Sequence, residues 1–123
     1  MDTIFYNSKG NPIAYSEDKQ TIYLFSGEAV AYLEGELVYS FSGKHLGRFL
    51  AGWLRDNHGD CVFFTDEAHG DPPHPPKHDP PPKALKHVIP AKQAQERTAL
   101  ASIHSTNWSR LSGRQFFPKN GSK

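Results

Sequence analysis

Four glycines at nearly regular intervals constrain this chain more than any other feature of its sequence. Gly10, Gly27, Gly43 and Gly59 are 17, 16 and 16 residues apart. The neighbouring positions repeat as well, because an apolar residue stands five positions before each glycine and a tyrosine stands four positions before three of them. An internal repeat of this kind indicates that similar supersecondary units build one fold together.

Each repeated unit has the pattern of a β-hairpin. The residues on either side of the glycines are rich in Tyr, Phe, Val and Ile, which suit a half-buried strand. A glycine that follows a polar residue supplies the positive φ that a two-residue hairpin turn requires. Gly35, Gly52 and residues 18–20 mark the reversals between units. We therefore expect residues 4–66 to form eight short strands in four hairpins, an all-β pseudo-fourfold fold.

The repeat also predicts which residues face each other within a hairpin. A two-residue turn places the residue four before the glycine opposite the residue three after it. Tyr23 is then paired with Val30, and Ile22 with Ala31. Small residues recur at the position of Ala31, which indicates a crowded place near the pseudo-fourfold axis. A single hairpin is not stable in water, so the four units must share one core.

The repeated units resemble the bacterial four-fold beta-flower domain. The resemblance is carried by Tyr-x-x-Ser-Gly-x-x-Val-Ala-Tyr-Leu (residues 23–33), Val-Tyr-x-Phe-Ser-Gly-Lys-His-Leu-Gly (38–47) and Arg-Asp-Asn-His-Gly-Asp-Cys-Val-Phe-Phe (55–64). It covers roughly residues 3–68, and the end of the chain, Trp-Ser-x-Leu-Ser-Gly-x-x-Phe-Phe (108–117), is similar to the tails of such proteins. The resemblance implies a petal-like arrangement of β-hairpins, and it brings no settled activity, cofactor or catalytic residue.

The chain divides into an acidic, aromatic half and a basic, proline-rich half. Residues 1–67 carry five Lys and Arg against ten Asp and Glu, whereas residues 68–123 carry nine against three. This balance excludes a strongly basic nucleic-acid binder, a collagen and a coiled coil. Eight of the ten prolines lie in residues 69–90, where the composition favours extended polyproline II. We therefore expect a β domain over residues 1–68, followed by a disordered spacer over 69–90.

The basic C-terminal tail, residues 91–123, contains two further features. Residues 91–104 are rich in Ala and Gln and predict one short, marginal helix. The segment 108–117 has apolar residues around a glycine, in a register like that of a degenerate fifth hairpin. These apolar residues are Trp108, Leu111, Phe116 and Phe117. Left exposed, they would promote aggregation, so we expect the segment to dock on its own β domain or on that of a partner.

Two aromatic columns of the repeat are the best candidate binding surface. One column contains Tyr6, Tyr23 and Tyr39 with Arg55 in the fourth place, and the other includes Tyr15 and Tyr32 with Arg48. If these faces are solvated, they form a platform for a peptide, a sugar or a partner protein. If they are buried, they are the core, which is the stronger alternative in a domain with few other large apolar residues. The two arginines break the repeat, and many beta-flower relatives have an aromatic residue at the position of Arg48.

Two groups of polar residues are candidates for metal binding or catalysis. His74 and His78, with neighbouring aspartates, would bind zinc or nickel weakly, but a flexible spacer lacks the fixed geometry of a metal site. Cys61 is the only cysteine, which excludes an intramolecular disulfide and a Cys-based zinc site. A Cys–His nucleophile is disfavoured because Cys61 lies in an apolar strand and His58 in a turn.

These features predict a noncatalytic binding or assembly module that uses no cofactor or metal and associates with itself or another protein. The alternative is a small enzyme or metal-dependent activity centred on His45, Asp56 and His58. The basic tail allows nonspecific attraction to nucleic acid or anionic lipid, and no specific nucleic-acid site is expected. The lone thiol, the acidic start without signal-peptide features and the lack of a long apolar run predict a cytoplasmic protein without a membrane span.

Overall fold

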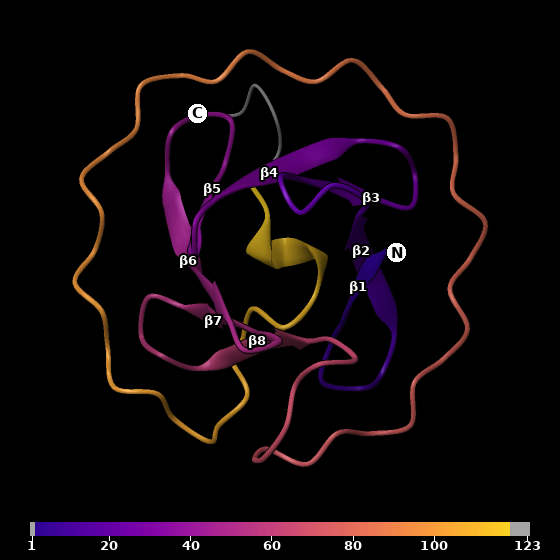
Figure 1. The fold of residues 1–123 in the computed structure, drawn as a ribbon, viewed down its shortest axis with the longest axis vertical. Helices are drawn as coiled ribbons and strands as arrows, with labels where there is room; N and C mark the ends of the chain where they lie inside the picture. Colours follow the sequence, from indigo (N-terminus) through magenta and orange to yellow (C-terminus); the bar gives the residue numbers. More distant parts are fainter. Residues whose placement is uncertain (1, 119–123) are drawn as a thin grey trace.

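Eight short antiparallel strands form a closed barrel in the computed structural model, which describes residues 2–118 (Figure 1). The strands are β1 (Thr3–Tyr6), β2 (Pro12–Ser16), β3 (Thr21–Leu24), β4 (Ala29–Glu34), β5 (Leu37–Tyr39), β6 (His45–Leu50), β7 (Trp53–Asp56) and β8 (Cys61–Phe64). Each strand pairs with its neighbour in the sequence, and β8 pairs with β1. The prediction of an all-β fold with eight strands in four hairpins is confirmed.

The hairpin turns differ from the two-residue turns that the sequence predicts. At the first turn the Gly10 N–H donates to the Asn7 carbonyl at 2.9 Å, and the Asn7 N–H donates to the Asn11 carbonyl at 2.9 Å. Gly10 has a φ of 80°, so the loop is a type I turn closed by a glycine bulge. The same pair of hydrogen bonds recurs in the other three hairpins. The sequence did not separate the two turn types because a polar residue followed by glycine suits both.

The extra turn residue shifts part of the predicted register. Ile22 faces Ala31 as predicted, but Tyr23 faces Ala29 and not Val30, because a bulge lies between Ile22 and Tyr23. An equivalent bulge occurs in each of the other three hairpins. The alternation of inward and outward side chains therefore restarts at each bulge, which places the tyrosine columns on a face of their own.

Two positions of the repeat contribute a buried residue from every hairpin to the core inside the barrel. The first position contributes Phe5, Ile22, Val38 and Leu54, and the second contributes Ala14, Ala31, Gly47 and Phe63. All of these residues are buried. A Cβ atom on Gly47 would lie 2.0 Å from the carbonyl oxygen of Arg55, so a side chain does not fit there. The crowding that the small residues predicted is present at this position.

The chain that follows the last hairpin, proline-rich in its first half, encircles the barrel (Figure 1). We call residues 72–105 the belt, which is drawn in orange outside the four hairpins. Its backbone N–H groups donate to the carbonyl oxygens of the four turn glycines, with pairs His78–Gly10, His87–Gly27, Glu96–Gly43 and Ser105–Gly59 at 2.9, 2.9, 2.8 and 3.1 Å. The four donors are nine residues apart, so one nine-residue segment spans each quarter of the barrel.

The belt differs from the tail that the sequence predicts. A disordered spacer over 69–90 would make no regular contact with the β domain, and a helix over 91–104 would bond to itself. The structure instead has the belt along the barrel, with no helix in residues 91–104. An extended chain has no internal hydrogen bonds, so its backbone groups need outside partners, which the hairpin turns supply.

After the belt, the chain enters the ring of hairpins as a plug, residues 108–117 (yellow in Figure 1). Phe116 and Phe117 are buried, with ring centroids 5.9 and 5.6 Å from that of Phe63. Trp108 forms a parallel bridge to Cys61, and Leu111 is 42% exposed. No fifth hairpin forms, because residues around Gly113 lead into a 3-10 turn, η1 (Arg114–Phe116).

Residues 2–118 contain no helix that is long and apolar enough to span a membrane.

Candidate functional site

Four pairs of cross-strand side chains mark the junctions between neighbouring hairpins. We number them first (Tyr15 and Tyr23), second (Tyr32 and Tyr39), third (Arg48 and Arg55) and fourth (Tyr6 and Phe64). The rings of the three aromatic junctions are stacked, with centroids 5.7, 6.0 and 5.3 Å apart. The two aromatic columns of the sequence thus meet as pairs, and the two arginines that break the repeat belong to one junction.

The tyrosines of these junctions do not form a solvated platform. The most exposed of the five, Tyr23, is only 7% exposed. The alternative in which the tyrosine columns are core is therefore the one that agrees with the structure. A ligand that reaches the first, second or fourth junction would first have to displace the belt.

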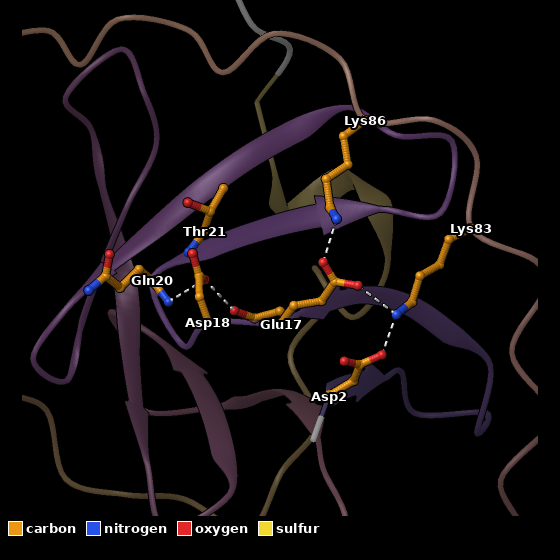
Figure 2. Close-up of polar contacts among 8 residues, drawn as sticks. Asp2, Glu17, Asp18, Gln20, Thr21, Lys83 and Lys86 are labelled. Atoms are coloured by element: carbon orange, nitrogen blue, oxygen red, sulfur yellow. Dashed lines mark hydrogen bonds and ion pairs between the residues drawn. The ribbon is translucent and has the colours of Figure 1, made fainter.

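Belt lysines cover the first junction, and Figure 2 shows the same two lysines, Lys83 and Lys86, bound to the Glu17 carboxylate. Lys83 Nζ lies 4.5 Å from the centre of the Tyr15 ring, and Lys86 Nζ lies 5.5 Å from that of Tyr23. Both ammonium groups also donate to the Glu17 carboxylate, Lys83 at 3.0 Å. These hydrogen bonds lower the pKa of Glu17. The pKa of Lys83 is raised by its hydrogen bonds to Asp2 and then to Glu17, and the pKa of Lys86 is raised by its hydrogen bond to Glu17. The lysines therefore attach the belt through both cation–π and ionic contacts.

Belt side chains also cover the second and fourth junctions. Lys92 Nζ lies 4.3 Å from the centre of the Tyr32 ring. At the fourth junction Lys77 Nζ lies 5.8 Å from the Tyr6 ring, and His74 stacks on the other ring of the pair at 4.6 Å. Three of the four junctions thus share one design, with two stacked rings beneath at least one basic side chain of the belt.

A nine-residue repeat in the belt explains this regularity and was not recognised from the sequence. Residues of one type recur nine positions apart in four groups. The groups are Pro72, Pro81 and Pro90; Lys77 and Lys86; Lys83 and Lys92; and His78 and His87. The run of prolines directs attention to composition and hides the period. A search for four units in residues 72–105, to match the four hairpins, would have found the nine-residue period.

The third junction has a different chemistry. Arg48 and Arg55 face each other across β6 and β7. The belt positions that carry lysine at the first junction hold Ala101 and His104 here. Like charges directly opposite each other in a sheet repel, and belt lysines at this place would add to the repulsion.

The two guanidinium groups of the third junction have unequal partners. Arg48 Nη1 donates to Glu36 Oε1 at 3.1 Å, and its Nη2 donates to the Ala99 carbonyl at 2.9 Å. Arg55 Nη2 donates to the Ser105 carbonyl at the long distance of 3.4 Å. The Nε atom of Arg55 is buried and has no hydrogen-bond partner among the residues that the structure describes. Arg55 is therefore the less satisfied of the two cations.

A cavity of about 60 Å³ lies between the third junction and the belt. On the barrel side it is lined by Arg48, Arg55 and Trp53, and on the belt side by Ala101 and His104. Two carboxylate residues, Glu36 and Asp56, also line it. The volume suits one small chemical group and is far below that of a cofactor pocket.

The residues of the catalytic alternative line a second cavity, of about 330 Å³. His45, Asp56 and His58 all border it, so the fold does bring them together. However, His45 Nδ1 accepts a hydrogen bond from the Ala99 N–H at 3.0 Å. Asp56 accepts from the His58 backbone at 2.9 Å and from Ser109 Oγ at 2.6 Å. These bonds hold the belt, a turn and the plug in place.

The remaining chemical candidates have structural surroundings. Cys61 is buried, and burial raises the pKa of its thiol, which disfavours the reactive thiolate. His74 stacks on Phe64. Within residues 2–118, no group of three or more His, Cys, Asp or Glu side chains is placed to hold a metal ion.

Acidification from pH 7.5 to pH 5.5 is expected to lower the free energy of unfolding. Burial lowers the pKa of His45, so its ring binds a proton less readily in the folded state than in the unfolded chain, where it does so below about pH 6.5. A base whose pKa falls on folding has no effect above that pH and destabilises the fold progressively below it. We expect a loss of about 1 kcal/mol from His45 at pH 5.5, measured by urea denaturation.

The variant His45→Asn is the control for this pH dependence, because an amide oxygen can accept the Ala99 N–H in place of Nδ1. Its stability is expected to fall less between the two pH values. Some dependence remains, since burial also lowers the pKa of His74. An identical fall in the parent and in the variant would show that His45 does not contribute.

Comparison with known proteins identifies one family. The model of the family described as 4-fold beta flower protein matches residues 3–117. The matched range includes the belt and the plug as well as the barrel. No curated protein and no solved structure matches the chain.

Proposed function

We propose that this chain, which belongs to the 4-fold beta flower protein family, is a noncatalytic binding module that recognises its ligand at the third junction. In this proposal the barrel is the scaffold, and the belt and plug close it within one chain. The observation that carries the proposal is the departure of one junction from the pattern of the other three. Two arginines and a cavity stand where the others have stacked rings.

The energetics of the repeat support this proposal. An aromatic pair stabilises a strand junction, whereas two cations at the same place repel each other. The first, second and fourth junctions show that the fold accepts the aromatic pair. A residue choice that breaks a local rule without a stabilising return is typical of a functional site.

An assembly function is the second candidate, and exposed aliphatic side chains on the belt favour it. Leu85, Val88, Leu100 and Ile103 are each 91 or 92% exposed. In this alternative they contact another protein or a second copy of the chain. A solution mass above that of a monomer for the full chain, reduced in the variant Leu85→Ser with Val88→Ser, would support assembly.

The binding proposal is tested by mapping ligand contacts on the full chain. We expect small ligands from a mixed set of anions, sugars and short peptides to change the backbone NMR signals of Arg48, Arg55 and residues 101–104. We also expect the ligands to remain chemically unchanged after long incubation. Signal changes around His45 and His58 together with conversion of a ligand would overturn the proposal and support the enzyme alternative.

A further inference from the structure

We infer that the third junction binds an oxyanion, the phosphate, sulfate or carboxylate group of a small ligand, between the guanidinium groups of Arg48 and Arg55. This inference rests on the proposed function and adds the chemical class of the ligand. Four observations lead to it: the charge of the pair, the unsatisfied donors of Arg55, the state of the nearby carboxylates and the size of the cavity.

The charges of the third junction are arranged for an anion. Arg48 and Arg55 are direct cross-strand partners, so their positive charges lie side by side on one face. The belt has no lysine above them, whereas it places Lys83 and Lys86 above the first junction. An anion between the arginines would turn the repulsion of the pair into two attractions.

Arg55 has a buried hydrogen-bond donor that no group among residues 2–118 uses. A guanidinium group carries five N–H donors in a planar fork. In the described part of the chain its one hydrogen bond, to the Ser105 carbonyl, is 3.4 Å long, and the buried Nε has no partner. A buried donor without a partner costs free energy. A bidentate oxyanion on Nε and Nη would satisfy this fork once the ligand displaces the atoms that cover Nε.

The two carboxylates of the cavity do not supply that partner. Asp56 already accepts three hydrogen bonds, from the backbone of His58 and Asp60 and from the Ser109 hydroxyl. Glu36 is the ion-pair partner of Arg48, and its side chain is 44% exposed. Neither carboxylate forms an ion pair with Arg55. Its guanidinium group lies over the Trp53 ring, 5.6 Å from the ring centre, so its charge has an aromatic contact and an anion could still neutralise it.

The cavity limits what is recognised. About 60 Å³ accommodates one oxyanion group, and not a nucleotide or a sugar phosphate as a whole. The rest of a larger ligand would lie outside, against the exposed belt residues 100–104. The junction would therefore hold the anionic end of a ligand and leave its remainder in solvent.

The experiment titrates the full chain with inorganic phosphate, sulfate, acetate and phenyl phosphate at constant ionic strength, with chloride as the reference. In the parent the side-chain Nε–H signal of Arg55 is followed by NMR, and in the parent and all variants the backbone signals of residues 100–104 are followed as well. We expect a saturable shift with at least one oxyanion, at a Kd of about 1 mM or lower. Tighter binding of phenyl phosphate than of phosphate would identify an ester as the source, and the reverse would identify the free ion.

Three variants separate a site from general charge. Arg55→Lys keeps the charge but loses the fork, and we expect its affinity to fall about tenfold. The double variant Arg48→Tyr with Arg55→Tyr restores the aromatic pair of the other junctions, so it should fold and lose the saturable response. Arg110→Gln removes one exposed positive charge outside the cavity and should bind as the parent does.

Two results would overturn the inference. One is an equal response of the parent to chloride and to every oxyanion. The other is the same saturable response, followed by backbone signals of residues 100–104, in the double tyrosine variant. If neutral ligands still bind at the third junction in either case, the oxyanion inference fails while the binding module stands. If ligands bind elsewhere, the proposed function itself fails.

Discussion

Replacing Phe116 and Phe117 together by alanine is expected to lower the free energy of unfolding by about 5–8 kcal/mol. Both rings are buried in the core cluster inside the barrel, against Phe63. Their ring centroids are 5.2 Å apart, so the two substitutions are coupled. The loss of stability in the double variant is therefore smaller than the sum of the losses in the two single variants. This loss is comparable to the whole stability of a small domain. Urea denaturation followed by circular dichroism measures it.

Leu111→Ala is the matched control for the plug. Leu111 belongs to the same apolar segment of the sequence, but it is 42% exposed. We expect this variant to lose less than about 1 kcal/mol. If the double phenylalanine variant and Leu111→Ala denature at the same urea concentration, the plug does not contribute to the core.

The variant Gly27→Ala is expected to lose about 3 kcal/mol, more than an ordinary glycine replacement in a turn. Gly27 has a φ of 100°, which is strained for alanine. A Cβ atom there would also lie 2.0 Å from the carbonyl oxygen of Leu85, so the belt has to move away from the second hairpin. Denaturation measures the stability, and faster hydrogen exchange of the His87 amide reports the loss of its bond to Gly27.

Gly35→Ala separates backbone strain from the belt contact. Gly35 also has a positive φ, of 61°, but nothing lies within 4 Å of its Cβ position. We expect a loss of about 1 kcal/mol and no change in the exchange of His87. Equal losses for the two glycine variants would contradict the position of the belt at Gly27.

The barrel could be predicted from the sequence because the residues that repeat have strong conformational preferences. The turn glycines located the four hairpins, and the small residue at Ala31 located a crowded core position. The bulges could not be predicted, since one extra turn residue leaves the composition of a hairpin unchanged. The belt was missed because its prolines hide the nine-residue period of the other residues. Its hydrogen bonds to the turns are also made by backbone groups, which any sequence carries.

The candidate site was predictable only in part. Arg48 and Arg55 stood out because each replaces an aromatic residue of the repeat. Their pairing depends on the register between β6 and β7, and the cavity depends on the belt, which residue types alone do not place. Tyr6, Tyr23 and Tyr39 were candidates on chemical grounds, but the structure buries all three.

The attachment of the belt to the turn glycines has a consequence for how such chains can change length. Each hairpin unit occupies 16 or 17 residues and each belt segment nine, and every turn glycine is joined to one fixed belt position. A chain that gained a hairpin without nine more belt residues would have a turn without a belt segment. A chain that lost a hairpin but kept its belt would have a belt segment without a turn. The two arrays are therefore expected to lengthen or shorten together, in coupled steps, even though they are separate in the sequence.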